Sequence, residues 1–193
     1  MPDDILGRIR EEVSRCEGCR LAETRTNPVF GIGDGKAPVL IVGEAPGRNE
    51  DETGEPFVGK AGERLNEVLA LAGLSRDEVF IANVLKCRPP RNRNPRPDEI
   101  AACSAYLIRQ IEAIGPKVIV TFGNFATQFV LGTKKGVSEL HGTLFKGVRV
   151  SHGDCGTASA YDVYPVFHPA ATIYRPQWRS VLEEDMRNLG TLL

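Results

Sequence analysis

Short apolar runs, each followed within a few residues by glycine or proline, alternate along this chain with segments of helical periodicity. Such runs are typical of buried strands. Strands that alternate with amphipathic helices form parallel βαβ units with helices on both faces of the sheet. We therefore predict an α/β fold: a three-layer α/β/α sandwich with a central, mainly parallel four-stranded sheet. The expected strands are 38–42, 79–85, 117–122 and 162–167, and the expected helices are an opening helix that ends near residue 16, then 65–72, 97–114, 125–131 and 177–193, with a hairpin over 143–150.

The length of the chain, 193 residues, is that of one compact domain. We expect a single domain over residues 1–193 that includes the opening helix and the C-x-x-C after it. The apolar runs are far shorter than the ~18 residues that cross a bilayer. No apolar stretch of a secretory signal opens the sequence. We therefore expect a cytoplasmic monomer that does not enter membranes.

The net charge of −1 gives the chain no overall positive field for nucleic acid. A local exception is the segment 86–96, which carries five basic residues and no acidic one. A solvated, proline-rich loop explains such a segment as well as a phosphate-binding loop does. Charge alone leaves both interpretations open.

The five cysteines are an odd number, which in a reducing compartment favours metal ligation or free thiols over disulfides. Cys16 and Cys19 form a C-x-x-C, and Cys87 and Cys103 flank a fifteen-residue interval. A zinc ribbon usually closes with a second C-x-x-C, whereas a 4Fe–4S cluster accepts four cysteines at varied spacing. From spacing alone, iron–sulfur, zinc and unliganded thiols all stay open. Cys155 is interpreted as a leftover thiol.

Residues 54–60 match the phosphate-loop pattern G-x-x-x-x-G-K, but Ala61 stands where serine or threonine would hold magnesium. The segment also follows acidic residues and not an apolar strand. We therefore set a nucleotide-hydrolysing function aside.

Polar and small residues follow each predicted strand, in segments 43–47, 83–90, 122–124 and 168–170. The carboxyl ends of parallel strands lie at one edge of the sheet, where ligands bind in such folds. We therefore expect one site at this edge.

The side chains expected at this edge suit a planar base. An amide at Asn83 can donate to and accept from a base edge, Phe57 can stack on the base, and His168 can face its oxygens. Glu44 adds a carboxylate. Together they would hold a nucleobase flipped out of the DNA stack.

Several motifs occur in a fixed order along the chain: residues 43–47 (GEAPG), 50–51 (ED), 56–59 (PFVG), 83–90 (NVLKCRPP) and 168–170 (HPA). In this order they resemble the family 4 uracil-DNA glycosylases, which are iron–sulfur enzymes. The resemblance extends from Cys16 to the C-terminal helix. The first four cysteines match the family's 4Fe–4S ligands, which raises iron–sulfur above zinc.

The resemblance implies a function: release of uracil from DNA to leave an abasic site, in base excision repair. It implies that Phe57 stacks on uracil, that Asn83 recognises its polar edge and that His168 stabilises negative charge on its O2. Glu44 would position water or steady the cationic sugar. Glu50 corresponds to the position that crowds the 5-methyl group and excludes thymine.

The first motif departs from the best-known uracil glycosylases of another branch, which carry aspartate where this chain has Ala45. Alanine cannot activate water, so we place Ala45 only among the substrate-binding residues. Three alternatives stay open. Glu44 takes over the role of the missing aspartate, Asn92 of the basic loop positions the water, or the departure of the base needs little help from the water. The sequence also lacks the insertion after this motif that marks a covalently bonding branch, so we expect turnover.

The expected partner is uracil-containing DNA, single- or double-stranded. A 4Fe–4S cluster on Cys87 and Cys103 would close the loop between them and hold its arginines against phosphates. The residue that fills the vacated base stack stays open among Ile173, Tyr174 and Arg175. Motifs of this kind do not reveal whether the protein docks to a replication clamp. The expected DNA contacts are Arg88, Arg91, Arg93, Arg96 and Arg175.

Two other classes of function remain. An iron–sulfur electron-transfer module would not need Phe57, Asn83 and His168 at one site. A non-catalytic nucleic-acid-binding protein would bind DNA equally well with and without uracil.

Overall fold

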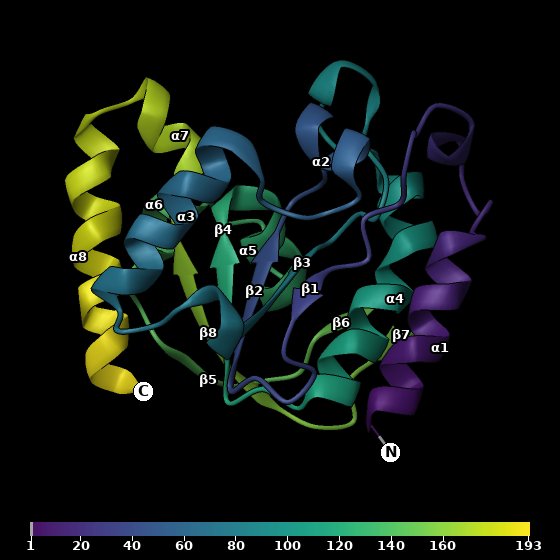
Figure 1. Cartoon of the computed structure of the whole chain (residues 1–193). Helices are drawn as coiled ribbons and strands as arrows, with labels where there is room; N and C mark the ends of the chain where they lie inside the picture. Colours follow the sequence, from purple (N-terminus) through teal and green to yellow (C-terminus); the bar gives the residue numbers. More distant parts are fainter. Residues whose placement is uncertain (1) are drawn as a thin grey trace.

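The computed structural model describes residues 2–193, and the side chains of these except residues 2–4 and 174. Its centre is a six-stranded sheet in the order β1-β3-β2-β4-β8-β5 (Figure 1). The four inner strands are parallel and end at the same edge of the sheet. They are β2 (Val39–Gly43), β3 (Val79–Asn83), β4 (Val118–Phe122) and β8 (Tyr161–Val166).

The three-layer α/β fold is confirmed, but the predicted number of four strands is wrong, because a short antiparallel strand is added at each edge. β1 (Ile32–Gly33) has two residues, both exposed, which is too short to give a pattern. β5 (Phe145–Val148) lies where a hairpin was expected and pairs with β8 through an irregular register. A separate two-stranded hairpin follows, made of β6 (Ser151–His152) and β7 (Cys155–Gly156).

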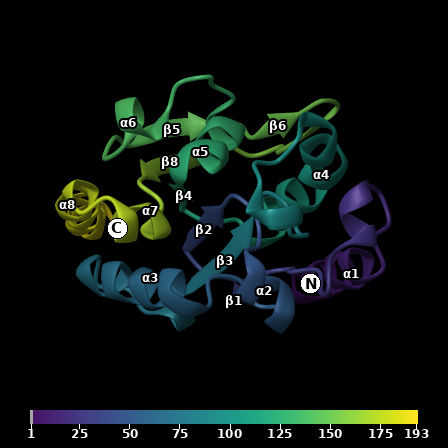
Figure 2. The ribbon, with the colours of Figure 1, turned by 90° about the horizontal axis from the view of Figure 1, so that it is seen from above.

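Long helices cover both faces of the sheet, as Figure 2 shows from above the carboxyl ends of the strands. Packing on both faces explains why β2, β3 and β4 are buried along their whole length. One face carries α3 (Gly59–Leu71) and α8 (Gln177–Leu192), and the other carries α1 (Pro2–Ser14), α4 (Pro97–Ile114) and α5 (Gly123–Leu131).

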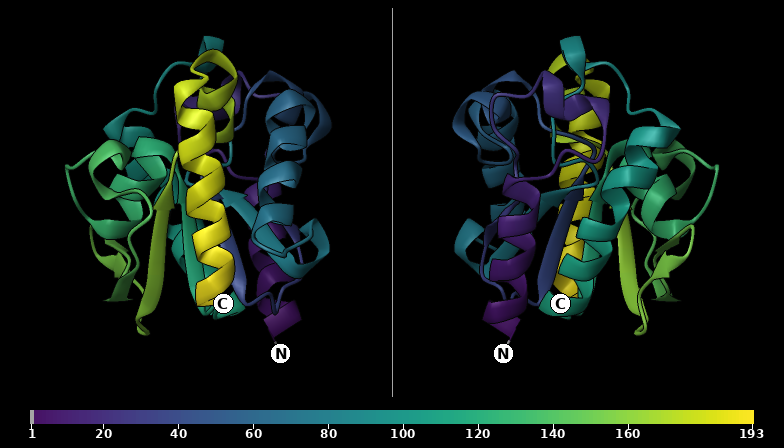
Figure 3. Two further views of the ribbon diagram at one scale, coloured as in Figure 1. Left: turned by 90° about the vertical axis from the view of Figure 1, so that its left-hand side faces the viewer. Right: turned by 90° about the vertical axis from the view of Figure 1, so that its right-hand side faces the viewer.

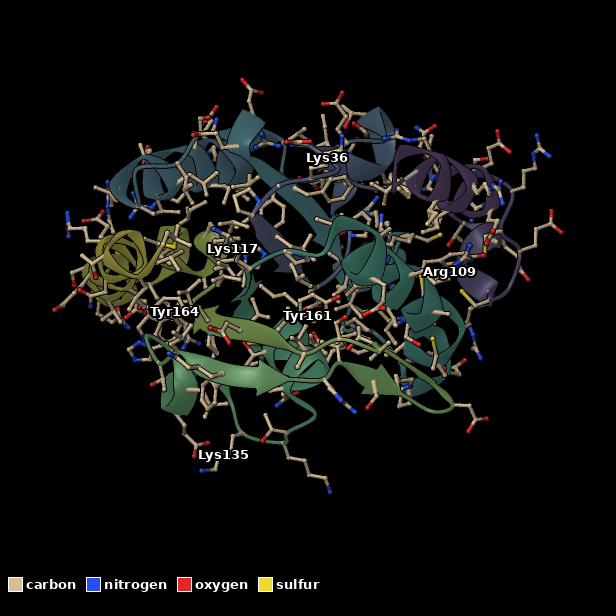
Figure 4. The ribbon with its side chains drawn as sticks, turned by 90° about the horizontal axis from the view of Figure 1, so that it is seen from below. Lys36, Arg109, Lys117, Lys135, Tyr161 and Tyr164 are labelled. Atoms are coloured by element: carbon tan, nitrogen blue, oxygen red, sulfur yellow. The ribbon has the colours of Figure 1, made fainter. Side chains whose placement is uncertain are left out.

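The strands supply the two cores with alternate side chains. Leu40 packs under α1 and α4, whereas its neighbour Ile41 packs under α3 and α8. Tyr161 and Tyr164 of β8, labelled in Figure 4, divide in the same way between the two cores. This period of two is the pleat of a strand buried on both faces.

Several short elements lie in the connections. They are too short to give helical periodicity, and the sequence analysis predicts none of them. α2 and α7 lie at the carboxyl edge of the sheet (Figure 1). The short elements of the connections are the helices α2 (Arg48–Thr53), α6 (Val137–Leu140) and α7 (Pro169–Tyr174), and the 3₁₀ turns Arg20–Glu23, Arg76–Glu78 and Pro90–Asn92.

α1 begins and α8 ends at the amino edge of the sheet, opposite α2 and α7 (Figures 1 and 3). The carboxyl edge carries the short helices α2 and α7 and the loops that follow the inner strands. Within the described residues, no helix combines the length and the apolar character needed to cross a membrane.

Candidate active site

A cavity of about 280 Å³ opens at the carboxyl ends of β2 and β3. It brings together predicted site residues from five separate segments of the chain. Asn124 is not among them, because its Oδ1 accepts a hydrogen bond from Val137 N–H of α6 at 2.8 Å. The lining residues are Glu44, Ala45, Pro46, Gly47, Glu50, Phe57, Ala61, Asn83, Pro89, Asn92, Arg93, His168 and Ala170.

Phe57 forms a fixed aromatic wall of this cavity. Its backbone has φ 51°, in the left-handed region, and its side chain is only 5% exposed. Arg76 holds the segment by donating to the carbonyls of Pro56 and Phe57, at 3.0 and 3.1 Å. The ring stacks on the imidazole of His168, with 5.5 Å between ring centroids and 21° between planes. A left-handed phenylalanine persists only where its surroundings hold it, so the ring is preorganised.

Asn83 is the last residue of β3 and lies opposite Gly43 of β2. A Cβ at Gly43 would lie 2.3 Å from Asn83 Oδ1 and 2.9 Å from the Phe57 ring, so only glycine fits there. Asn83 is 3% exposed, and no described residue hydrogen-bonds its side-chain amide. A side-chain amide in a protein interior normally has a hydrogen-bond partner. Since no described residue supplies one and Asn83 lines the cavity, its amide is free to pair with a ligand there.

His168 precedes α7 and caps it, because Nδ1 accepts a hydrogen bond from the Ala170 N–H at 3.1 Å. The ring proton of the neutral imidazole is therefore on Nε2. Burial lowers the pKa of His168 to about 4. At neutral pH the ring is uncharged, and it offers one N–H donor to the cavity.

The two glutamates of the cavity differ in how their oxygens are used. Glu50 Oε2 accepts from Gly47 N–H and Oε1 accepts from Val58 N–H, each at 3.0 Å. It thereby ties the turn after β2 to the segment that carries Phe57. No described residue hydrogen-bonds the Glu44 carboxyl group. Burial raises the pKa of Glu44 to about 7.

The basic loop reaches the cavity through Asn92 and Arg93. Arg91 and Asn92 have φ values of 57° and 54°, and Asn92 Oδ1 accepts from Arg88 Nε at 2.7 Å. Arg93 forms two hydrogen bonds, at 2.9 and 2.5 Å, with the fully buried carboxylate of Glu99 on α4. This ion pair was not predicted, because a run of basic residues does not indicate which arginine has a partner.

Four of the five cysteines line a second, smaller pocket between α1 and α4: Cys16, Cys19, Cys87 and Cys103. Three N–H groups are directed at their sulfurs. Gly18 N–H reaches Cys16 Sγ at 3.4 Å, Lys86 N–H reaches Cys103 Sγ at 3.2 Å, and Arg25 Nη1 reaches Cys87 Sγ at 3.2 Å. Cys155 lies apart, on β7.

The four thiols suit a cluster of several metal atoms and not a single metal ion. Among the described residues, no group of three or more His, Cys, Asp or Glu side chains is close enough together to hold a single metal ion. A cluster of several atoms needs its four thiolates around it, with N–H groups directed at the sulfurs. Four thiols around one pocket, with three such N–H groups, fit that requirement. Arg25 was not predicted at this pocket, because it belongs to no motif in the sequence.

The fold and this edge of the sheet define a class of protein. The family model described as the uracil DNA glycosylase superfamily matches residues 30–188. That range contains all residues of the cavity and two of the four grouped cysteines.

Curated relatives narrow the class. The chain is 45% identical to the type-4 uracil-DNA glycosylase of Archaeoglobus fulgidus, over 98% of this chain and 92% of that protein. It is 47% identical to the enzyme of the same name from Sulfurisphaera tokodaii (98% and 85%) and 44% identical to that from Saccharolobus solfataricus (98% and 87%). This chain belongs to the type-4 uracil-DNA glycosylase family.

Proposed function

We propose that this protein is a DNA repair glycosylase that hydrolyses the N-glycosidic bond of deoxyuridine in DNA, releasing uracil and leaving an abasic site. The observation that carries the proposal is the unpaired amide of Asn83, which lines the cavity beside the fixed ring of Phe57 and the neutral imidazole of His168. The relatives named above, covered almost end to end, support it. The enzyme would act in base excision repair, as a cytoplasmic monomer.

Each group has a distinct role in binding. Phe57 stacks on the uracil ring, and the amide of Asn83 pairs with its polar edge, where it can both donate and accept. Ala45 gives the flipped base an apolar wall. Glu50, held by two backbone N–H groups, is fixed at the position that would crowd a 5-methyl group and so exclude thymine.

Bond breaking follows from the charges that develop. The electron pair of the C1′–N1 bond leaves with uracil, so negative charge spreads to O2 while C1′ becomes cationic. His168 Nε2–H donates to O2, and a neutral donor directed at a developing anion in a dry site contributes strongly to catalysis. Water then adds its oxygen to C1′ and gives a proton to the Glu44 carboxylate, and the uracil anion takes up a proton from solvent.

Glu44 is the residue that we assign to the water and the cationic sugar. Its carboxylate has no competing partner, whereas Asn92 Oδ1 already accepts from Arg88. Asn92 then contributes to the wall of the cavity and to the shape of the loop.

The reaction is expected to depend on pH through Glu44. The pKa of Glu44 is about 7, so the carboxylate form, and with it the single-turnover rate, rises as pH increases from about 6 to about 8. His168, with a pKa of about 4, stays neutral over this range. Glu44→Gln is expected to lower the single-turnover rate by roughly 10²-fold and to abolish its rise with pH around pH 7. Rates measured in single turnover across this pH range test both points.

The matched control for this measurement is Glu52→Gln, on the exposed side of α2. In this variant the single-turnover rate is expected to rise with pH around the same midpoint as in the wild-type protein. A wild-type rate that does not vary over this pH range would remove Glu44 from the reaction.

The four grouped cysteines would hold a 4Fe–4S cluster. The cluster supplies a rigid cross-link and no chemistry at the glycosidic bond, because the cavity residues account for the reaction without electron transfer. Cys87 and Cys103 bracket the basic loop, so ligation would fix its arginines.

DNA contacts are proposed for Arg88, Arg91, Arg96 and Arg175. Arg93 is revised: its guanidinium is paired with buried Glu99, so we assign it to holding the loop and not to a phosphate. Ile173 is 41% exposed at the end of α7, whereas Arg175 lies over the Trp178 ring at 4.4 Å. Ile173 is therefore the residue proposed to fill the vacated stack. The side chain of Tyr174 lies outside the described residues.

Loss of the two free arginines is expected to weaken DNA binding without changing base preference. Arg91 and Arg96 are exposed, and phosphate contacts carry no sequence information. Replacing both with alanine should weaken binding to uracil-containing and normal duplexes alike, and should reduce the salt slope by about 1.8, at roughly 0.9 per lost contact. Titrations at several salt concentrations measure this.

The control removes two positive charges from the opposite edge, with Lys36→Ala and Lys117→Ala, both labelled in Figure 4. This variant should keep the wild-type salt slope. A selective loss of binding to uracil-containing DNA in the arginine variant would instead make those arginines base readers.

The proposed function is tested by incubating the protein with a uracil-containing oligonucleotide and then with alkali, which breaks the strand at an abasic site. Breakage at uracil and not at thymine or cytosine is expected. An electron-transfer module would give no breakage. A binding protein would give none either, and would bind both oligonucleotides equally.

A further inference from the structure

Lys86 is buried to an unusual degree for a lysine, with 1% of it exposed. Lysine is almost never fully buried unless it is paired. Its Nζ donates to the main-chain carbonyl of Asn83 at 2.8 Å and to Gln110 Oε1 at 2.6 Å. Both partners are neutral, so Lys86 serves these two oxygens and does not form an ion pair with a described carboxylate.

Gln110 carries the network further. It lies on α4, is fully buried, and its Nε2 donates to the Phe30 carbonyl at 2.9 Å. One chain of hydrogen bonds therefore joins the end of β3, the C-terminal half of α4 and the segment that leads into β1. Buried networks in which each member has a partner fix one arrangement of the backbone.

The main chain of Lys86 is held as firmly as its side chain. Its carbonyl accepts from Val29 N–H at 2.7 Å, and its N–H donates to Cys103 Sγ at 3.2 Å. The next residue is Cys87, a second lining residue of the cysteine pocket. Lys86 thus stands between the cysteine pocket and the strand end that carries Asn83.

The side chain of Lys86 folds back along the chain, and its hydrogen bond to the carbonyl of Asn83, three residues earlier, closes the turn 83–86. The Asn83 carbonyl is held on this inner side, while the Asn83 amide faces the active-site cavity. An apolar side chain of similar length at position 86 would leave two buried oxygens without their donor. An unsatisfied buried group is costly, so the turn would rearrange.

We infer that Lys86 is a positioning residue for base recognition: it sets the orientation of the Asn83 amide by fixing the turn between that residue and the cysteine pocket. The inference rests on the proposed function. It assigns Lys86 no contact with uracil and no part in bond breaking.

The test compares Lys86→Met with Lys117→Met, the same change at an exposed lysine on the opposite edge. Four quantities are measured: the single-turnover rate on uracil-containing DNA, inhibition by free uracil, affinity for abasic-site DNA, and iron content. Lys86→Met is expected to slow uracil release and to weaken inhibition by uracil, each by roughly 10–100-fold. Affinity for abasic-site DNA and iron content should stay within about twofold of wild type.

A double variant separates positioning from general damage. If Lys86 acts through Asn83, Lys86→Met adds no more than about a twofold loss in a protein that already carries Asn83→Ala. A purely structural role would lower the rate in both backgrounds to the same extent. Full additivity, or wild-type behaviour of Lys86→Met, overturns the inference.

Gln110 gives a second route should Lys86→Met fail to fold. Gln110→Leu removes an acceptor of Nζ and should give the same pattern of losses. Gln110→Glu keeps that acceptor but loses the Nε2–H donor to the Phe30 carbonyl, so its losses should lie between those of Gln110→Leu and wild type. Equal losses in these two variants count against the inference. A wild-type protein that releases no uracil overturns the proposed function itself, which separates that failure from a failure of Lys86.

Discussion

Replacing His168 with alanine is expected to slow the release of uracil in a single turnover by about 10²–10³-fold. The Nε2–H of His168 stabilises charge that appears on the leaving base only as the bond breaks, so its loss raises the barrier and changes ground-state binding little. Affinity for abasic-site DNA should stay within about twofold of wild type. Rapid-quench measurements with enzyme in excess give the first quantity, and an equilibrium titration gives the second.

The chain offers a matched control for this change, His152→Ala on β6, which lies in the separate hairpin outside the cavity. This variant is expected to cleave at the wild-type rate. A near-normal rate for His168→Ala would mean that the imidazole only caps α7 through Nδ1, and that backbone N–H groups of the cavity hold the oxyanion.

Cys87→Ser is expected to remove the iron from a protein that otherwise carries about four irons per chain with acid-labile sulfide. Binding of a metal group contributes to folding free energy, so its loss should lower the melting temperature by on the order of 10 °C. DNA affinity should fall with it, since Cys87 and Cys103 bracket the basic loop. Iron and sulfide analysis, a melting curve and a DNA titration measure the three effects.

Cys155→Ser serves as the control, because Cys155 lies on β7, away from the four grouped thiols. It should leave iron content, melting temperature and DNA affinity unchanged. Iron lost from Cys155→Ser, or one zinc in the wild-type protein in place of iron, would show that the assigned ligands or the assigned metal are wrong.

The parts of the fold that the sequence predicts are those with a local signal. α4 was expected at residues 97–114 and is found there, because Pro97 opens the helix and Gly115 ends it with φ 60°. β1 has no such signal, because two exposed residues show no alternation. The second strand was expected to reach residue 85 but ends at Asn83, since Lys86 folds back onto that residue in a way that no apolar pattern reveals.

The site divides in the same manner. Asn83 and His168 could be placed at one edge from their positions after apolar strands, and the cavity does contain both. The partners of charged side chains could not be predicted, because they depend on contacts far apart in the sequence. Three examples are the hydrogen bonds of Glu50 to two backbone N–H groups, the ion pair of Arg93 with Glu99, and the burial of Lys86. In the sequence, each of these residues is recognisable only as a charged side chain.

The start of α1 and the end of α8 lie at the amino edge of the sheet, whereas the active-site cavity opens at the carboxyl edge (Figure 1). A tether attached at the end of α8 would therefore hold the molecule on a solid support with its cavity facing the solution. A reporter domain fused there would also stand clear of a passing duplex. The architecture thus makes this chain suitable for surface-bound assays, in which a long DNA molecule is drawn past a fixed enzyme.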